Sequence, residues 1–199
     1  MQQQKSGLKL RSFGVAATLV AASLAFAGCT TTRPNESGTP ATQRSEINSG
    51  VDSALSRLYA SSPQSRDLVA RAKGVLVFPS VLSAAFVVGA EYGKGALRVN
   101  GQNQGYYSTT GGSFGFQAGA QSKAVVLLFM TDEALRNFQQ SKGWTVGADA
   151  TVAVANIGAN GSIDSNTVRK PVVGFVMNNA GLMAGVSLDG AKINRLDMK

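Results

Sequence analysis

Glycine recurs through residues 105–121, GYYSTTGGSFGFQAGAQ, and the second half of this stretch alternates strictly between two sets of residues. Side chains of an extended chain point to opposite faces in turn, so one face of the second half carries four apolar residues, Phe114, Phe116, Ala118 and Ala120. Repeated glycine inside a strand indicates a bend, a bulge or the close approach of another backbone. Because the same texture recurs at residues 87–99, 143–157 and 172–188, the sequence predicts one coiled, glycine-rich antiparallel sheet.

The length and apolar content of the chain predict one α+β domain. The 199 residues leave room for one compact domain beyond a leader, because single domains commonly span about 100–200 residues. A hydrophobic fraction of 44% suffices for a core, and 23 glycines favour bent strands over long helices. We expect a barrel- or sandwich-like sheet packed with two N-terminal helices and one further helix.

The N-terminal segment has the organisation of a lipoprotein signal peptide, predicted at residues 1–28. A basic leader precedes an apolar run at residues 13–27, which has the length of a signal-peptide core and is short for a membrane span. The run ends in Phe-Ala-Gly-Cys, which resembles a bacterial lipobox, and we predict that Cys29 is acylated (palmitate or a similar chain). The alternative is an ordinary signal peptide followed by an incidental cysteine. Cys29 is the only cysteine, so an internal disulfide is excluded.

Residues 29–44 are rich in Thr, Pro and Ser and are predicted to form a flexible tether before the domain at residues 45–199. Thr30 stands where an aspartate would signal inner-membrane retention. Resemblance to lipoprotein sorting therefore favours the bacterial outer membrane, with the domain facing the periplasm. The net charge is +8, and three basic residues precede Cys29, so residues 29–199 carry +5. This surplus suits an anionic surface.

Periodicity predicts helices at residues 45–60 and 62–73 and a third one after Thr131. The first two are expected to cover one side of the sheet or, alternatively, to face a membrane. Asp132 and Glu133 fall in the first turn of the third helix, where negative charge is stabilising, so capping is favoured over acid–base chemistry. Residues 124–130 are apolar throughout, as in a strand buried on both faces. Other strands are predicted at residues 75–79, 84–90, 96–99, 106–108, 114–121, 144–157, 171–177 and 182–188.

The residue types present argue against most catalytic and metal sites. The chain has no histidine, which excludes Ser-His-Asp and Cys-His systems, and one cysteine is too few for a thiolate metal site. We expect no catalytic site, no metal and no cofactor; a hydrolase stays open only if a buried lysine meets a serine. Residues 89–95, GAEYGKG, lack the glycine spacing of a phosphate-binding loop, so a glycine-rich turn is predicted there.

Seven basic residues are expected in or beside turns and strand ends: Lys73, Lys94, Arg98, Lys123, Lys142, Arg169 and Lys170. If some of them converge at one rim of the sheet, they would form a patch that binds anionic headgroups; otherwise they are ordinary solubilising charges. They form no continuous basic run, and an exported protein has little access to nucleic acid, so a nucleic-acid partner is not expected.

Several motifs resemble the SYLF domain over roughly residues 47–197. They are AKGVLVFP at 72–79, GAEYGKG at 89–95, GFQAGAQ at 115–121, and VVLLFMT at 125–131 followed by Ala134, Leu135 and Phe138. The resemblance implies a non-enzymatic lipid-binding module: eukaryotic members bind phosphoinositides, and some bind and bundle actin. For an envelope lipoprotein it implies anionic phospholipids as partners. The alternative is an envelope structural or protein-interaction module whose partner is an unidentified envelope or host protein.

Overall fold

Four long strands form the centre of a single curled sheet in the computed structural model, which describes residues 38–85, 88–114, 119–155, 163–164 and 166–198. These strands are β1 (Gly74–Ala85), β2 (Val88–Val99), β3 (Gln102–Phe114) and β4 (Gly119–Phe129). Shorter strands complete the order β5-β9-β3-β2-β1-β4-β7-β6, and β8 pairs with β7. They are β5 (Trp144–Thr145), β6 (Ala153–Val154), β7 (Val172–Asn178), β8 (Gly181–Leu182) and β9 (Lys192–Leu196). All pairs are antiparallel except β6 with β7.

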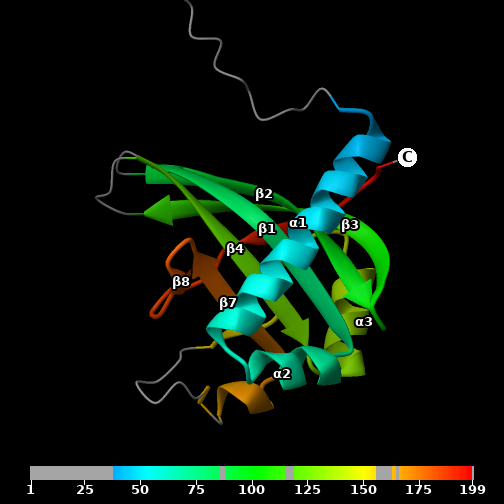
Figure 1. Cartoon of the computed structure of the whole chain (residues 1–199), viewed down its shortest axis with the longest axis vertical. Helices are drawn as coiled ribbons and strands as arrows, with labels where there is room; N and C mark the ends of the chain where they lie inside the picture. The colour runs from blue at the N-terminus through cyan, green and yellow to red at the C-terminus, as the bar shows by residue number, and fades with distance from the viewer. Residues whose placement is uncertain (1–37, 86–87, 115–118, 156–162, 165, 199) are drawn as a thin grey trace, which may run out of the picture. The chain divides into compact units, whose positions relative to one another are not determined.

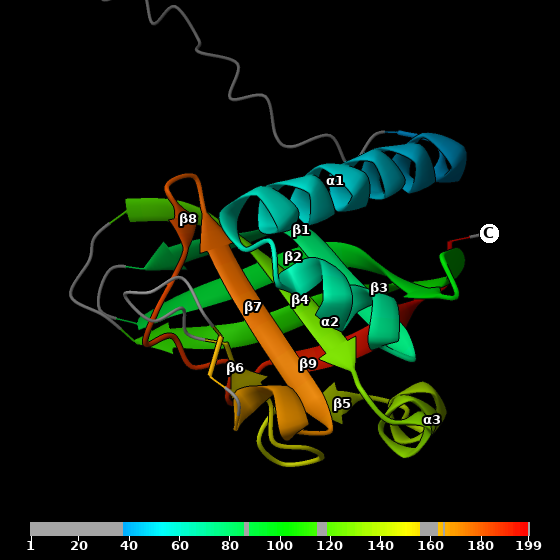
Figure 2. The same ribbon diagram turned by 60° about the horizontal axis from the view of Figure 1, so that its bottom comes forward.

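Helices lie on both sides of this sheet. Helix α1 (Pro40–Ser61) crosses one side diagonally and is followed by α2 (Ser65–Arg71), as Figures 1 and 2 show. We call this side the helix face. Helix α3 (Asp132–Gln140) packs against the other side, the inner face, and a short 3-10 helix, η1, spans Thr167–Arg169. The predicted α+β fold, a coiled glycine-rich sheet with two N-terminal helices and one further helix, is confirmed.

Each face of the sheet has its own hydrophobic core. The helix-face core joins buried residues of α1, such as Val51 and Leu58, to alternate positions of the central strands. The inner-face core contains the intervening positions together with Phe138 of α3 and Trp144. Strand β4 contributes to both, with Ala124–Phe129 buried at every position, so the prediction of a strand buried on both faces is confirmed.

Strand β2 runs without interruption through residues 91–95, so the turn predicted there is wrong. The register of β1 shifts at a bulge around Pro79, which carries the β1 backbone close to β2. A Cβ on Gly95 would collide with the Val77 carbonyl oxygen and lie 2.7 Å from the Phe78 ring. Glycine is needed here because a neighbouring backbone approaches closely, rather than because the chain turns.

The first helix begins earlier than predicted, so residues 40–44 belong to α1 rather than to the tether. Thr39 is its N-cap, with the Thr42 amide donating to the Thr39 hydroxyl at 3.3 Å, and Pro40 occupies the first turn, where its missing N–H removes no helical bond. Helix α2 begins at Ser65, three residues after the predicted start at residue 62.

The third helix follows its prediction closely. Thr131 caps it by accepting from the Ala134 amide at 3.2 Å, and two acidic residues occupy its first turn. Phe138 packs against three other aromatic rings of the inner core in tilted or edge-on geometry at centroid distances of 4.8–5.5 Å, those of Tyr107, Phe129 and Trp144.

The C-terminal third departs most from the prediction. A long strand was expected at residues 144–157; the described part, residues 144–155, holds two short strands separated by a turn, in which Gly147 has φ 88° and the Thr145 amide donates to Asp149. The strand expected at 182–188 is reduced to β8, whereas β9 was not predicted. The signal peptide, Cys29 and residues 115–118 of the alternating stretch lie outside the described residues.

Candidate functional site

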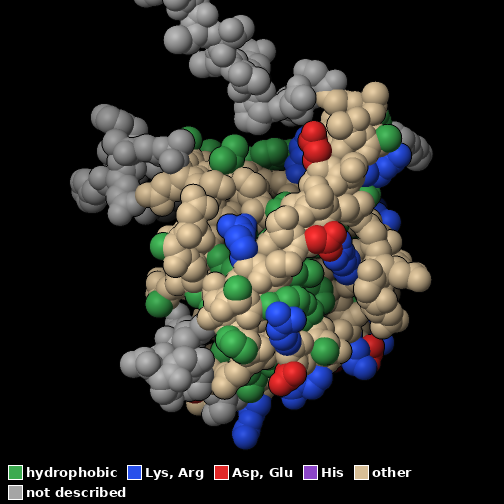
Figure 3. Space-filling model, viewed as in Figure 1, with side chains coloured by type: hydrophobic (Ala, Val, Ile, Leu, Met, Phe, Trp, Pro, Cys, Tyr) green, Lys and Arg blue, Asp and Glu red, His purple; other side chains and the backbone are tan. Residues whose placement is uncertain are grey.

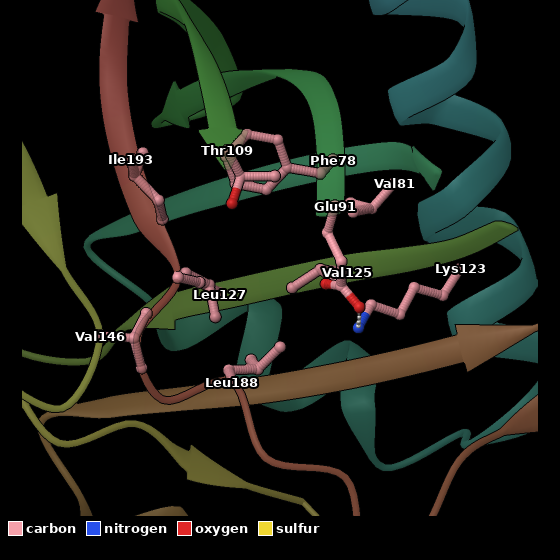
Figure 4. Close-up of a pocket in the computed structure, with 11 residues that line it drawn as sticks. Phe78, Val81, Glu91, Thr109, Lys123, Val125, Leu127, Val146, Leu188 and Ile193 are labelled. Atoms are coloured by element: carbon pink, nitrogen blue, oxygen red, sulfur yellow. Dashed lines mark hydrogen bonds and ion pairs between the residues drawn. The ribbon is translucent and has the colours of Figure 1, made fainter. Parts of the chain in front are cut away.

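A small cavity opens on the inner face between the central strands and the loops around Val146 and Leu188 (Figure 4). Its volume is about 20 Å³, which is room for about one water molecule. Most of its lining is apolar, and Lys123 and Glu91 supply the charged groups among its described residues. The cavity is therefore too small for an acyl chain or a nucleotide.

Lys123 and Glu91 form an ion pair at the edge of this cavity. The Lys123 Nζ lies 2.9 Å from the Glu91 Oε1, and the side chains are 16% and 18% exposed. They project from β4 and β2, the strands on either side of β1, and Figure 4 shows them pointing toward one another. Because removing one partner would leave a largely desolvated charge, this pair is a structural contact rather than a free cation. It also offers no buried lysine–serine pair of the kind a hydrolase would need.

Lys94 and Arg98 lie on the helix face, where they meet α1. Arg98 forms an ion pair with Asp52 at 2.6 Å and donates to the Asn48 carbonyl at 3.4 Å, which joins β2 to the helix. Within the described residues, the Lys94 ammonium contacts the Gln43 side-chain oxygen at a long 3.5 Å. Among the ion pairs of the described residues, none includes Lys94.

The other predicted headgroup residues lie in loops. Lys73 is 3.7 Å from Asp132, with both side chains at least half exposed. Lys142 follows α3, and Arg169 and Lys170 lie at the end of η1; all three are exposed. The structure therefore places Lys73 and Lys170 at one end of the sheet, where the nearby Gly74 and Val172 both pair with Phe129. Lys94 and Lys123 lie farther along the strands on opposite faces, so the seven residues do not all meet at one rim.

Two exposed hydrophobic residues beside Lys94 were not predicted. Leu82 of β1 and Tyr92 of β2 are 46% and 43% exposed and are direct partners in the sheet. Tyr92 lies two residues from Lys94 and shares its face. The sequence feature that could have predicted them is the alternation of residues 90, 92 and 94. It places these residues on one face only if residues 89–95 form a strand instead of a turn.

Two tyrosines have perturbed acidities. Burial raises the pKa of Tyr107 above its ordinary value of 10.0, partly offset by the positive charge of Arg195. Burial also raises the pKa of Tyr59, against the opposing charges of Arg66 and Arg98. Both tyrosines remain neutral at physiological pH and are packing residues.

Neither a metal site nor a membrane-spanning helix is found in the described part of the chain. No three acidic, histidine or cysteine side chains gather there around a common point. No helix within it combines the length and apolar character needed to cross a bilayer.

Comparisons with known proteins show what the chain is similar to. Residues 110–197 match the model of the Ysc84 family, described as Las17-binding protein actin regulator. SH3 domain-containing YSC84-like protein 1 is 31% identical over 129 residues in Xenopus laevis and 32% identical over 132 residues in Homo sapiens. These alignments cover 62% of this chain but only 38% and 37% of those relatives. The matched descriptions name a regulator and SH3-containing proteins rather than enzymes. The resemblance drawn from the sequence motifs is confirmed by this match to the Ysc84, or SYLF-domain, family model over residues 110–197 and by the similarity to YSC84-like proteins.

Proposed function

We propose that the domain binds the headgroups of anionic phospholipids, phosphoinositide-type lipids included, with Lys94 as the principal contact. The observation that carries the proposal is that the Lys94 ammonium contacts no carboxylate among the described residues. Arg98, Lys123 and Lys73 each face a carboxylate, whereas Lys94 faces the neutral amide of Gln43 at 3.5 Å. A phosphate oxygen would be a stronger acceptor for this ammonium than the amide is, because both partners of the bond would be charged.

The exposed cations in the loops support this binding without defining its position. Lys142, Arg169 and Lys170 are separated from Lys94, so they act through the long-range field of a positively charged domain. A basic residue near an anionic membrane surface contributes about 1 kcal/mol, and salt screens this contribution. Weak, salt-sensitive binding is the result we expect from the isolated domain.

Acylation of Cys29 would make such weak binding sufficient to orient the domain at the membrane. A chain anchored by Cys29 to the outer membrane meets lipid headgroups at a high effective concentration, so each headgroup contact orients the domain instead of recruiting it. The support for the anchor is the lipobox-like ending of the leader.

Vesicle flotation of residues 30–199 tests headgroup binding. This chain keeps all of residues 37–199, which form one compact unit with both cores. We expect recovery with vesicles containing phosphatidylglycerol and little recovery with neutral vesicles. Lys94→Gln should reduce recovery more than Lys142→Gln, a matched loss of one exposed positive charge. Equal recovery with neutral and anionic vesicles would refute the proposal.

A second candidate function is protein interaction. It is favoured by the exposed Leu82 and Tyr92 and by the description of the matched family as a Las17-binding actin regulator. A photo-crosslinking residue at position 82 in intact cells should then capture an envelope or host protein. Crosslinks to lipid alone would count against this candidate.

A further inference from the structure

An exposed apolar patch continues from Leu82 and Tyr92 toward the end of the β1–β2 hairpin. The next pair on the same face, Ala84 and Ala90, is also exposed and directly matched across the two strands. We call these four residues the 82/92 patch. Leu82 and Tyr92 are the large hydrophobic residues that remain exposed in the described part of the chain. Figure 3 shows hydrophobic side chains at the upper margin of the molecule, where the hairpin passes beyond α1.

The path of α1 explains why the patch is uncovered. The helix packs closely on the bulge of β1: a Cβ on Gly50 would lie 3.0 Å from the Pro79 ring. Strand β1 continues from Pro79 to Ala85, about 20 Å at the ordinary rise of a strand. Helix α1 crosses the sheet instead of following the strand (Figures 1 and 2), and Leu82, Ala84, Ala90 and Tyr92 stay exposed.

The charges around the patch fit an anionic bilayer. Lys94 lies next to Tyr92 on the same face, and its long stem allows the ammonium to reach the headgroup level while apolar neighbours lie deeper. Within residues 80–95, Glu91 is the only acidic residue; it points to the inner face, where Lys123 neutralises it. Tyrosine is itself suited to the boundary between headgroups and acyl chains, because its ring is apolar and its hydroxyl is polar.

The start of the described chain lies beside the same surface. Gln43, in the first turn of α1, contacts Lys94. Thr39 is ten positions after Cys29, so an extended chain between them spans at most about 35 Å. Acylation of Cys29 would therefore hold this end of the domain close to the bilayer, which favours lipid over a protein as the occupant of the patch.

From these observations we propose that the 82/92 patch inserts into the outer part of the acyl region while Lys94 contacts a phosphate. This inference rests on the proposed headgroup binding and adds to it an apolar contact, a depth and an orientation. The apolar contact resists salt, whereas the Lys94 contact does not, so the two are separable by experiment.

Tryptophan fluorescence on vesicles tests insertion. The native Trp144 is buried at 2% exposure and gives a constant background. In residues 30–199 carrying Tyr92→Trp, vesicles containing phosphatidylglycerol should shift the emission to the blue, and brominated acyl chains should quench it. Gln139→Trp, at an exposed position of α3 on the inner-face side, should show neither effect.

A second measurement uses variants without a new fluorophore. Replacing both Leu82 and Tyr92 by serine should lower the vesicle partition coefficient roughly tenfold, given the apolar area removed, and the loss should persist at high salt. Lys94→Gln should lower it only at low salt. If the protein floats with anionic vesicles but Tyr92→Trp is neither shifted nor quenched, insertion is refuted while headgroup binding stands. Absence of flotation would overturn both proposals, and crosslinks from position 82 to protein instead of lipid would overturn insertion.

Discussion

Replacing Lys123 by methionine tests whether this lysine stabilises the fold or binds a ligand. The substitution keeps the length of the side chain and leaves the Glu91 carboxylate, 18% exposed, without its partner at 2.9 Å. Loss of one partner of a fully buried pair costs about 3–5 kcal/mol. Since about a sixth of each side chain is exposed, we expect a smaller loss of about 2 kcal/mol in the free energy of unfolding. For a domain of this size, that loss lowers the Tm by about 4–8 °C.

Urea denaturation and vesicle flotation of the same variants provide the assay. The double variant Glu91→Gln/Lys123→Met removes both charges and should recover part of the lost stability, with a coupling energy of about 1 kcal/mol or more. Lys94→Gln should show the opposite behaviour, with unfolding unchanged and flotation reduced. If Lys123→Met kept its stability and lost vesicle binding, the interpretation of the ion pair as structural would be refuted.

Three further predictions concern packing, acidity and the anchor. Gly95→Ala, whose Cβ would meet the Val77 carbonyl, should destabilise the domain by several kcal/mol, whereas Gly112→Ala, with no atom within 4 Å of the new Cβ, should leave chemical denaturation unchanged. Burial raises the pKa of Tyr107. The stability that the neutral Tyr107 side chain contributes is therefore complete below about pH 10 and is lost as the pH rises through the raised value. Tyr107→Phe should flatten the fall in Tm between pH 8 and 11. Metabolic labelling with a palmitate analogue should mark the full chain and not Cys29→Ser, and equal labelling of both would exclude Cys29 as the acylation site.

Elements with strong local signals were predicted well. Helix α3 has a threonine cap, acidic residues in its first turn and an apolar pair at helical spacing, and β4 is apolar at every position. Strand β9 lacked such a signal, because Ile193 is its only fully buried residue and its pairing with β3 is set by distant residues. Residues 144–155 alternate like a strand, yet Gly147 and the Asp149 carboxylate fold them into a turn over the inner core.

The bulge at Pro79 was the feature that sequence periodicity missed, and it determines the roles of Lys94 and Lys123. Both lysines were predicted to contact headgroups, and alternation alone places each on one face of its strand. Their partners depend on the register of β1, which places Val81 opposite both Gly93 and Lys123 and brings Glu91 within reach of Lys123 across the inner face. The same bulge fixes where α1 crosses the sheet, and so leaves Leu82 and Tyr92 exposed beside Lys94. The bulge at Pro79 therefore brings Glu91 to Lys123 and leaves an apolar surface exposed next to Lys94. Sequence periodicity missed it because it depends on contacts between strands that are far apart in sequence.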